Sequence, residues 1–321
     1  MCVIDLIDTH DQLTELMEQI DHASKAKYVS LLRTALASNR IGRIEGLSLA
    51  SGHLPGYDRI HRCQNGNPLR IEVMGPAVVE ADGMRGLPWF QDPGKTKNGH
   101  SVVLKVVYGN VRVLLGGDLN VPAEEHLLDI HAGPLPEDGD VAAEEAMMQR
   151  ARAALEVDVA KSCHHGSGDF STRFLRAVNP VATVISSGDD EPHCHPRPNT
   201  LGAVGRHSRG DRPLIFSTEL SRSTAEYTKP AIATQEEIRL LVAKLQEAEE
   251  ADKAALQRKL DRLLDQAERN VAVYGLIVVR TDGQRVVIAQ KLERRRDGTS
   301  EEFDLQWLMP DANGVLSTEE Q

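Results

Sequence analysis

The clearest local signal in the chain is the stretch SVVLKVVYGNVRVLLGGDLN, residues 101–120. Its two apolar runs flank Gly109 and Asn110, a two-residue turn of the kind that needs positive φ, so the stretch predicts a β-hairpin. The second arm leads directly into Gly117 and Asp118, which places a carboxylate just after a buried strand. Open α/β sheets hold their ligands at such strand ends, so Asp118 is a first candidate for chemistry.

Strands and helices alternate after this hairpin. Three short apolar runs predict strands, and three further segments predict helices. The strands are expected at 157–162, 181–186 and 213–218, and the helices at 144–155, 170–178 and 200–208. Nearly all-apolar strands that alternate with helices are typical of a layered α/β domain with buried sheets.

The pattern before the hairpin is less regular. Leucines at helical spacing predict helices in the first forty residues. Residues 41–100 are richer in Gly and Pro, with a strand-like piece at 69–75 and an irregular loop predicted at 87–100.

A long segment without Gly or Pro, residues 234–269, interrupts the alternation. Thr234 followed by Glu237 predicts a capping-box start for a helix. One continuous helix of about 54 Å, a bent helix and a helical hairpin all fit the pattern. The helical segment is expected either to pack on the domain or to pair with a second copy as a coiled coil.

The last part of the chain returns to β-structure. Apolar runs around Asp282 and Gly283 predict a second hairpin, and the residues after about 293 are charged and expected to be partly loose. The predicted boundaries are 1–233 for the main domain, 234–270 for a helical insertion, 271–293 for the returning hairpin and 294–321 for the C-terminal segment.

The composition is that of a soluble protein. Apolar residues make up 40% of the chain and charged residues 26%, and the first residues carry acids where a signal peptide needs bases. No apolar run is long enough to span a bilayer, so the sequence predicts a cytoplasmic protein without a membrane partner. The net charge of −11 opposes loose adhesion to nucleic acid, although basic clusters occur at 206–212 and 294–296.

Four cysteines, Cys2, Cys63, Cys163 and Cys194, lie far apart in the sequence. They form no C-x-x-C pair and no secretion signal accompanies them, so we expect no disulfide framework. Cys163 and Cys194 flank histidines, but a cysteine beside such a motif is more often a small buried hydrophobe than a metal ligand.

Several histidines and one aspartate lie where predicted strands begin or end. They are His100, Asp118, His164, His165, His193 and His195. Imidazole and carboxylate ligands delivered from several strand ends are typical of a catalytic zinc site. A carboxylate such as that of Asp118 can also bridge two metal ions about 3.5–4 Å apart. Each residue has an ordinary alternative, because an Asp after two glycines is often a turn former and a loop histidine is often solvated.

Together these motifs resemble the metallo-β-lactamase superfamily, and most closely its ComEC-like branch. That branch has an Asn-x-x-Ser segment before a hairpin, Gly-Asp after it, then Lys-x-x-His-His-Gly-Ser, a strand with Pro, Ala and Ser, and a His-Pro-x-Pro loop. The matching segments are 98–101, 117–118, 161–167, 180–186 and 195–198, so the resemblance covers roughly residues 98–218.

The resemblance implies an αββα sandwich that holds metal ions at the edge of its two sheets and hydrolyses its substrate with water. By position, Asp118 would bridge the metals, His165 would be the histidine ligand, and His100 would be a further ligand. His164 and His195 would face the substrate as catalytic residues, and His195 would donate to a phosphate oxygen. The expected cofactor is zinc, as one or two ions, with manganese as the alternative.

The sequence departs from the family at its main metal signature, His-x-His-x-Asp-His, which belongs upstream of these motifs and is absent. We therefore expect an N-terminally incomplete metallo-β-lactamase-like α/β fold with a helical insertion near the C-terminus. The expected function is metal-dependent hydrolysis of a phosphodiester, in a small molecule or a nucleic acid. The alternative is an inactive or partner-completed remnant that acts as a binding module, with a partner chain or self-association through 234–269.

Overall fold

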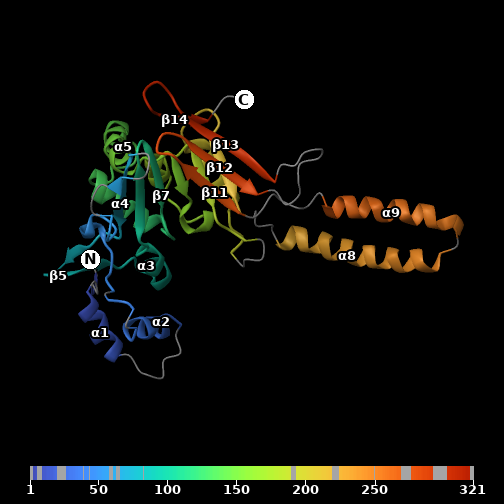
Figure 1. The fold of residues 1–321 in the computed structure, drawn as a ribbon, viewed down its shortest axis with the longest axis horizontal. Helices are drawn as coiled ribbons and strands as arrows, with labels where there is room; N and C mark the ends of the chain where they lie inside the picture. The colour runs from blue at the N-terminus through green and yellow to red at the C-terminus, as the bar shows by residue number, and fades with distance from the viewer. Residues whose placement is uncertain are drawn as a thin grey trace. The chain divides into compact units, whose positions relative to one another are not determined.

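A computed structural model gives the fold (Figure 1). It describes residues 3–5, 9–19, 27–38, 40–42, 44–57, 61–62, 66–81, 83–188, 193–218, 224–248, 250–268, 276–291 and 302–318. The chain divides into two compact units. Unit 1 comprises residues 1–164, 169–180 and 282–284, and unit 2 comprises residues 165–168, 181–281 and 285–321.

Mixed β-sheet forms the centre of unit 1. Its described strands are β2 (His61–Arg62), β3 (Pro68–Gly75), β6 (Val103–Tyr108), β7 (Val111–Leu115) and β8 (Val159–Lys161). They are neighbours in the order β8-β7-β6-β3-β2, with β7 and β8 parallel and the other neighbours antiparallel. Tyr108 pairs with Val111, and Gly109 adopts φ 59°, as the turn requires. The predicted hairpin is therefore confirmed.

A small antiparallel sheet lies near the N-terminus of the chain. It consists of β1 (Val3–Asp5), β5 (Met84–Pro88) and β4 (Val79–Ala81), in that order. The helices predicted in the first forty residues are present as α1 (His10–Gln19) and α2 (Lys27–Leu36). The strand β1 was missed, because three residues are too few to show the alternation that marks a strand.

Further helices pack in unit 1: α3 (Pro93–Gly99), α4 (Val121–Ala132), α5 (Val141–Leu155) and α6 (Thr172–Val178), with one-turn η1 (Leu49–Ser51). The helix α3 corrects the prediction of an irregular loop at 87–100. Asp92 caps it by accepting a hydrogen bond from the Lys95 amide at 2.8 Å, and Pro93 takes its first position. Two glycines in a seven-residue helix lower its propensity, which hid it in the sequence pattern.

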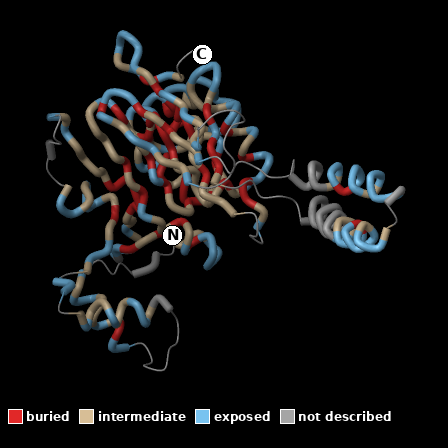
Figure 2. Tube along the Cα trace, turned by 45° about the vertical axis from the view of Figure 1, so that its right-hand side comes forward, coloured by how far each residue is buried: buried red, intermediate tan, exposed pale blue. Residues whose placement is uncertain are grey.

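The core of unit 1 is built mainly from α4, α5 and α6 against β6, β7 and β8. Figure 2 shows buried stretches running through the strands and the helices beside them. The strand β7 shows the expected alternation, since Leu114 is 1% exposed and its neighbour Leu115 is 41% exposed. Because β7 is held in place by this burial, the place where the chain leaves the sheet, just before Asp118, is also fixed.

Unit 2 contains a parallel strand pair. β9 (Ala182–Ile185) pairs with β10 (Leu214–Ser217), and α7 (Pro198–His207) lies between them in the chain. Parallel neighbours need a crossover of this kind. The two strands and the helix predicted for this region are confirmed to within one or two residues.

A helical arm, defined as α8 (Thr224–Glu247) and α9 (Glu250–Glu268), follows in unit 2. The two helices lie side by side (Figure 1). Leu241 and Leu260 are buried, and Lys259 Nζ lies 2.8 Å from a carboxylate oxygen of Glu237. Of the forms that the sequence left open, the arm takes the helical hairpin.

The predicted start of this helix at Thr234 is wrong. The helix α8 begins at Thr224 and includes Pro230. Proline removes a backbone donor and usually marks the end or the first turn of a helix. For this reason the sequence predicts a helix start after Pro230 and not before it.

A four-stranded antiparallel sheet completes the described part of unit 2. Its strands are β11 (Ile277–Thr281), β12 (Val286–Lys291), β13 (Phe303–Pro310) and β14 (Leu316–Thr318), paired in chain order. The hairpin predicted around Asp282 and Gly283 is confirmed. The prediction of a partly loose C-terminal segment is wrong for 303–318, because the charges around 293–302 masked the alternation in FDLQWLMP. The basic cluster at 294–296 lies outside the described residues.

The protein is thus a mixed α/β protein, as predicted, and the αββα sandwich and the domain boundaries stay predictions. None of the described helices has the length and apolar character needed to cross a membrane. Cys163 and Cys194 are free thiols, whereas Cys2 and Cys63 lie outside the described residues.

Candidate active site

The turn η2 (Cys163–Gly166) has an uncommon backbone, and the chain passes from unit 1 to unit 2 within it. His164, His165 and Gly166 have φ values of 45°, 53° and 78°. Side chains with a Cβ rarely adopt this left-handed conformation, which costs roughly 1–2 kcal/mol per residue. Strain of this kind persists where the surroundings enforce it and gathers at functional sites. The turn is therefore a candidate for function on geometry as well as on sequence.

Contacts on both sides of the turn enforce this backbone. In unit 1 the His164 amide donates to the Gly117 carbonyl at 3.0 Å. In unit 2 a Cβ on Gly166 would lie 2.7 Å from Pro196 Cβ, and the Arg197 amide donates to the Gly166 carbonyl at 2.8 Å. The His-Pro-x-Pro loop therefore anchors the turn directly.

Asp118 stands at the end of β7 in unit 1. Gly117 before it has φ 61°, and a Cβ there would lie 2.5 Å from Ser101 Cβ. The Asp118 amide donates to Ser101 Oγ at 2.9 Å, so the serine of the Asn-x-x-Ser segment positions the Gly-Asp pair. The Asp118 side chain is 40% exposed, and Lys161 Nζ lies 4.0 Å from its carboxylate. A carboxylate so placed can reach a solvent-borne cation.

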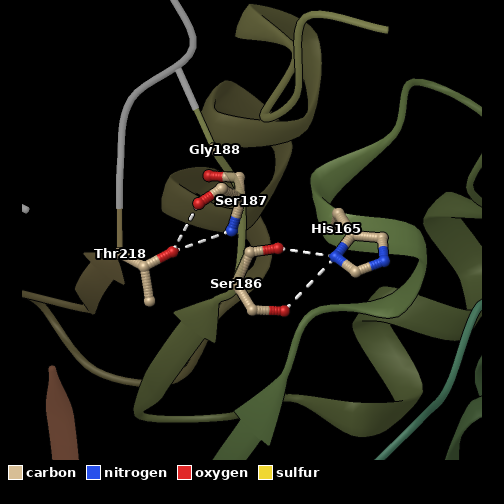
Figure 3. Close-up of a pocket in the computed structure, with 5 residues that line it drawn as sticks. All are labelled: His165, Ser186, Ser187, Gly188 and Thr218. Atoms are coloured by element: carbon tan, nitrogen blue, oxygen red, sulfur yellow. Dashed lines mark hydrogen bonds between the residues drawn. The ribbon is translucent and has the colours of Figure 1, made fainter. Parts of the chain in front are cut away.

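His165 lies in unit 2 and lines a pocket of about 340 Å³ together with Ser186, Ser187, Gly188 and Thr218 (Figure 3). Its Nδ1 lies 2.6 Å from the Ser186 carbonyl oxygen and 3.3 Å from Ser186 Oγ. Because a carbonyl only accepts, Nδ1 carries the proton and Nε2 carries the lone pair. Figure 3 shows this second ring nitrogen pointing away from Ser186.

The other predicted histidines are held differently. Asn98 Nδ2 lies 3.4 Å from His164 Nε2, so the amide can donate to this ring nitrogen. His100 Nε2 lies 2.9 Å from the Pro88 carbonyl oxygen, to which it donates. Nδ1 is therefore the ring nitrogen of His100 that can accept a hydrogen bond or bind a metal. His195 is buried, and its ring stacks on His193 with centroids 5.8 Å apart.

Among the residues that the structure describes, no group of three or more His, Cys, Asp or Glu side chains could hold a metal ion. His100 and Asp118 of unit 1 are both described, and neither belongs to a group of three such side chains among the described residues. The ligand roles of His100, Asp118 and His165 and the catalytic roles of His164 and His195 therefore stay predictions. The Asp118 carboxylate is exposed enough to act as a ligand. The His165 ring is held in the tautomer that leaves Nε2 for a metal.

Glu124, which the sequence pattern did not single out, interacts in unit 1 with Cys163, the first residue of the turn. It is buried on α4, where its carboxylate accepts from the Ser171 amide at 2.5 Å and interacts with the Cys163 thiol. Burial raises the pKa of Glu124 to about 8, although both hydrogen bonds oppose this shift. Burial also raises the pKa of the Cys163 thiol. An acid in the first turn of a helix usually faces solvent, so the sequence offered no signal for it.

The raised pKa of Glu124 predicts a pH-dependent stability. The folded chain keeps the proton up to about pH 8, whereas the unfolded chain releases it near the usual value of 4.5. This contribution to the free energy of unfolding is complete below pH 4.5 and is lost as the pH rises toward 8, with a slope of at most about 1.4 kcal/mol per pH unit. Urea unfolding of Glu124→Gln should show a shallower decline over this window than the unaltered chain; parallel curves would contradict the burial of this carboxyl.

Part of this chain is similar to known proteins. It is similar to ComE operon protein 3 of Bacillus subtilis (strain 168), with 27% identity over 122 residues, which are 38% of this chain and 13% of that protein. It is also similar to Competence protein ComA of Neisseria gonorrhoeae, with 31% identity over 137 residues, which are 41% of this chain and 16% of that protein. No protein-family model and no solved structure matches the chain.

The matched region is thus only a small part of either relative. The similarity supports the ComEC-like part of the sequence prediction, and it does not address the metallo-β-lactamase superfamily or a metal. Over about two-fifths of its length, the chain is similar to ComE operon protein 3 and to Competence protein ComA.

Proposed function

We propose that the chain is a metal-dependent hydrolase of phosphodiesters, of the kind that occur in nucleic acids. The geometry of His165 carries the proposal. Its ring is oriented by the Ser186 carbonyl, it sits on a strained turn, and it lines a pocket with hydroxyl side chains. Histidine ligands of metals usually donate their other ring N–H to a carbonyl or carboxylate in this way.

Asp118 and His165 have the donor chemistry that zinc requires. Asp118 would contribute a carboxylate oxygen, and His165 would contribute Nε2. His100 would serve as a further ligand through Nδ1, because its Nε2 meets the Pro88 carbonyl. When bound, zinc, or manganese in its place, supplies Lewis-acid polarisation of the phosphodiester and activation of water.

The remaining residues would bind and orient the substrate. Lys161, which donates to the Gly117 carbonyl at 3.0 Å, adds positive charge beside Asp118. His164 and His195 are the proposed substrate contacts, with His195 donating to a phosphate oxygen. The similarity to Competence protein ComA, together with that to ComE operon protein 3, supports a role related to DNA uptake, so a nucleic acid is the favoured substrate over a small molecule.

The proposal is tested by hydrolysis of bis(p-nitrophenyl) phosphate by the full chain. We expect the rate to fall to the background after stripping with a chelator and to return on addition of zinc. His165→Ala should recover at least about 100-fold less activity than the unaltered chain after reloading. His53→Ala is the matched control, because His53 lies at a β-bridge to Glu72 and outside the site. Activity that is equal in His165→Ala and the unaltered chain would reject the assignment.

The alternative, a binding module without activity of its own, draws support from the helical arm. Leu240 and Val242 are exposed apolar side chains on α8. The binding module predicts a folded chain that hydrolyses nothing with any metal. A partner-completed enzyme predicts that activity arises only on mixing with the second chain.

A further inference from the structure

The four-stranded sheet β11–β14 carries a second surface, outside the segment 98–218 that resembles the hydrolase family. Val286, Ile288 and Leu308 are buried on one side of this sheet. Because side chains alternate along a strand, the intervening residues point to the opposite side, here called the outer face. By their strand pairing, the outer face includes Arg280, Lys291, Phe303, Leu305 and Trp307. Arg285 joins this set because its guanidinium lies over the Trp307 ring.

A row of apolar side chains follows β13 on the outer face. Phe303, Leu305 and Trp307 alternate with the inward residues and span about 14 Å along the strand. Leu305 is 49% exposed and Trp307 is 37% exposed. Large apolar side chains gathered on an exposed sheet face mark an interaction surface rather than a core.

Basic side chains border both ends of this row. Arg285 Cζ lies 5.7 Å from the centre of the Trp307 ring. Arg280 pairs with Val287, which in turn pairs with Trp307, and Lys291 pairs with Phe303 at the other end. Among the described strand residues of the outer face, every charged side chain is basic. The outer face therefore carries basic side chains at both ends of its apolar row, on a chain with a net charge of −11.

We propose that the outer face binds single-stranded nucleic acid. The bases would stack against Phe303 and Trp307, and the phosphates would lie near the basic side chains at the two ends of the row. Stacking on aromatic rings combined with a basic surface is how single strands are held without sequence preference. A duplex hides the faces of its bases. A second copy would bring like charges together, and this opposes face-to-face pairing.

The bound strand would also be the phosphodiester substrate proposed above, and only this connection rests on the proposed function. Binding at the outer face requires neither a metal nor hydrolysis. The two proposals can therefore fail separately, and the binding experiment is done with a chelator present so that no strand is cut.

The test is fluorescence anisotropy of a fluorescein-labelled oligothymidine of about 16 nucleotides, titrated with the full chain. We expect saturable binding that Trp307→Ala weakens at least about fivefold and that Trp307→Phe retains, because phenylalanine still stacks. Arg280→Glu should weaken binding and also lower its dependence on salt. Leu31→Ala is the matched control, since Leu31 is an exposed apolar side chain on α2, away from the outer face in the sequence.

The proposal is overturned if Trp307→Ala and Trp307→Phe both bind as tightly as the unaltered chain, or if a duplex of equal length competes as well as the single strand. It is also overturned if Trp307→Ala instead changes the sedimentation coefficient of a dimer, which would assign the outer face to a second copy. A loss of binding in Trp307→Ala counts in favour only when its circular dichroism spectrum matches that of the unaltered chain.

Discussion

Asp118→Asn is expected to lower the zinc-dependent hydrolysis of a phosphodiester by at least about 100-fold. The substitution keeps the size of the side chain and removes the negative charge that a metal ligand needs. The Asp118 side chain is 40% exposed, and its backbone is positioned by Ser101 and Gly117 rather than by the carboxylate. The fold should therefore tolerate the change, and the loss should appear in kcat/KM.

Asp129→Asn is the matched control for this experiment. Asp129 is an exposed residue of α4, so its substitution should leave both the rate and the unfolding temperature unchanged. If Asp118→Asn hydrolyses the substrate as fast as Asp129→Asn does, Asp118 is a turn residue and not a ligand.

Leu114→Ala is expected to lower the free energy of unfolding by about 2–5 kcal/mol. Leu114 is 1% exposed and belongs to the core cluster of unit 1, so truncation removes buried contacts and leaves a cavity. The neighbouring Leu115 is 41% exposed, and Leu115→Ala should cost less than about 1 kcal/mol. Urea unfolding of the two variants measures this difference.

The comparison of these two leucines tests the register of β7 directly. A shift by one residue would exchange the buried and exposed positions along the whole strand. A larger loss of stability in Leu115→Ala than in Leu114→Ala would therefore contradict the pairing of β6 with β7.

The sequence predicts those parts of the fold whose signals are local. The hairpin around Gly109 and Asn110 follows from a turn type that needs positive φ between two apolar runs. The strands β9 and β10 follow from short apolar runs bounded by turn residues. The failures occur where local signals conflict, as at α3, where glycines oppose an Asp-Pro helix start, and at α8, where Pro230 lies inside the helix.

The candidate site depends on contacts between distant segments, and these are not encoded in local patterns. The sequence singles out His164 and His165 but not their left-handed backbone, which Gly117 and the loop at Pro196 enforce. The choice of His165 as the ligand rested on resemblance, and its contact with Ser186 gives that choice a physical reason. Glu124 stayed hidden because its burial depends on Ser171, which lies 47 residues away.

Removing and restoring the metal shows whether this chain hydrolyses phosphodiesters with a bound metal. The measurement is the rate of bis(p-nitrophenyl) phosphate hydrolysis by the unaltered full chain, first stripped with a chelator and then titrated with zinc or manganese. We expect background rates after stripping and a saturable return of activity with added metal. A rate that is independent of metal, or no activity at any metal concentration in a folded chain, would contradict this expectation.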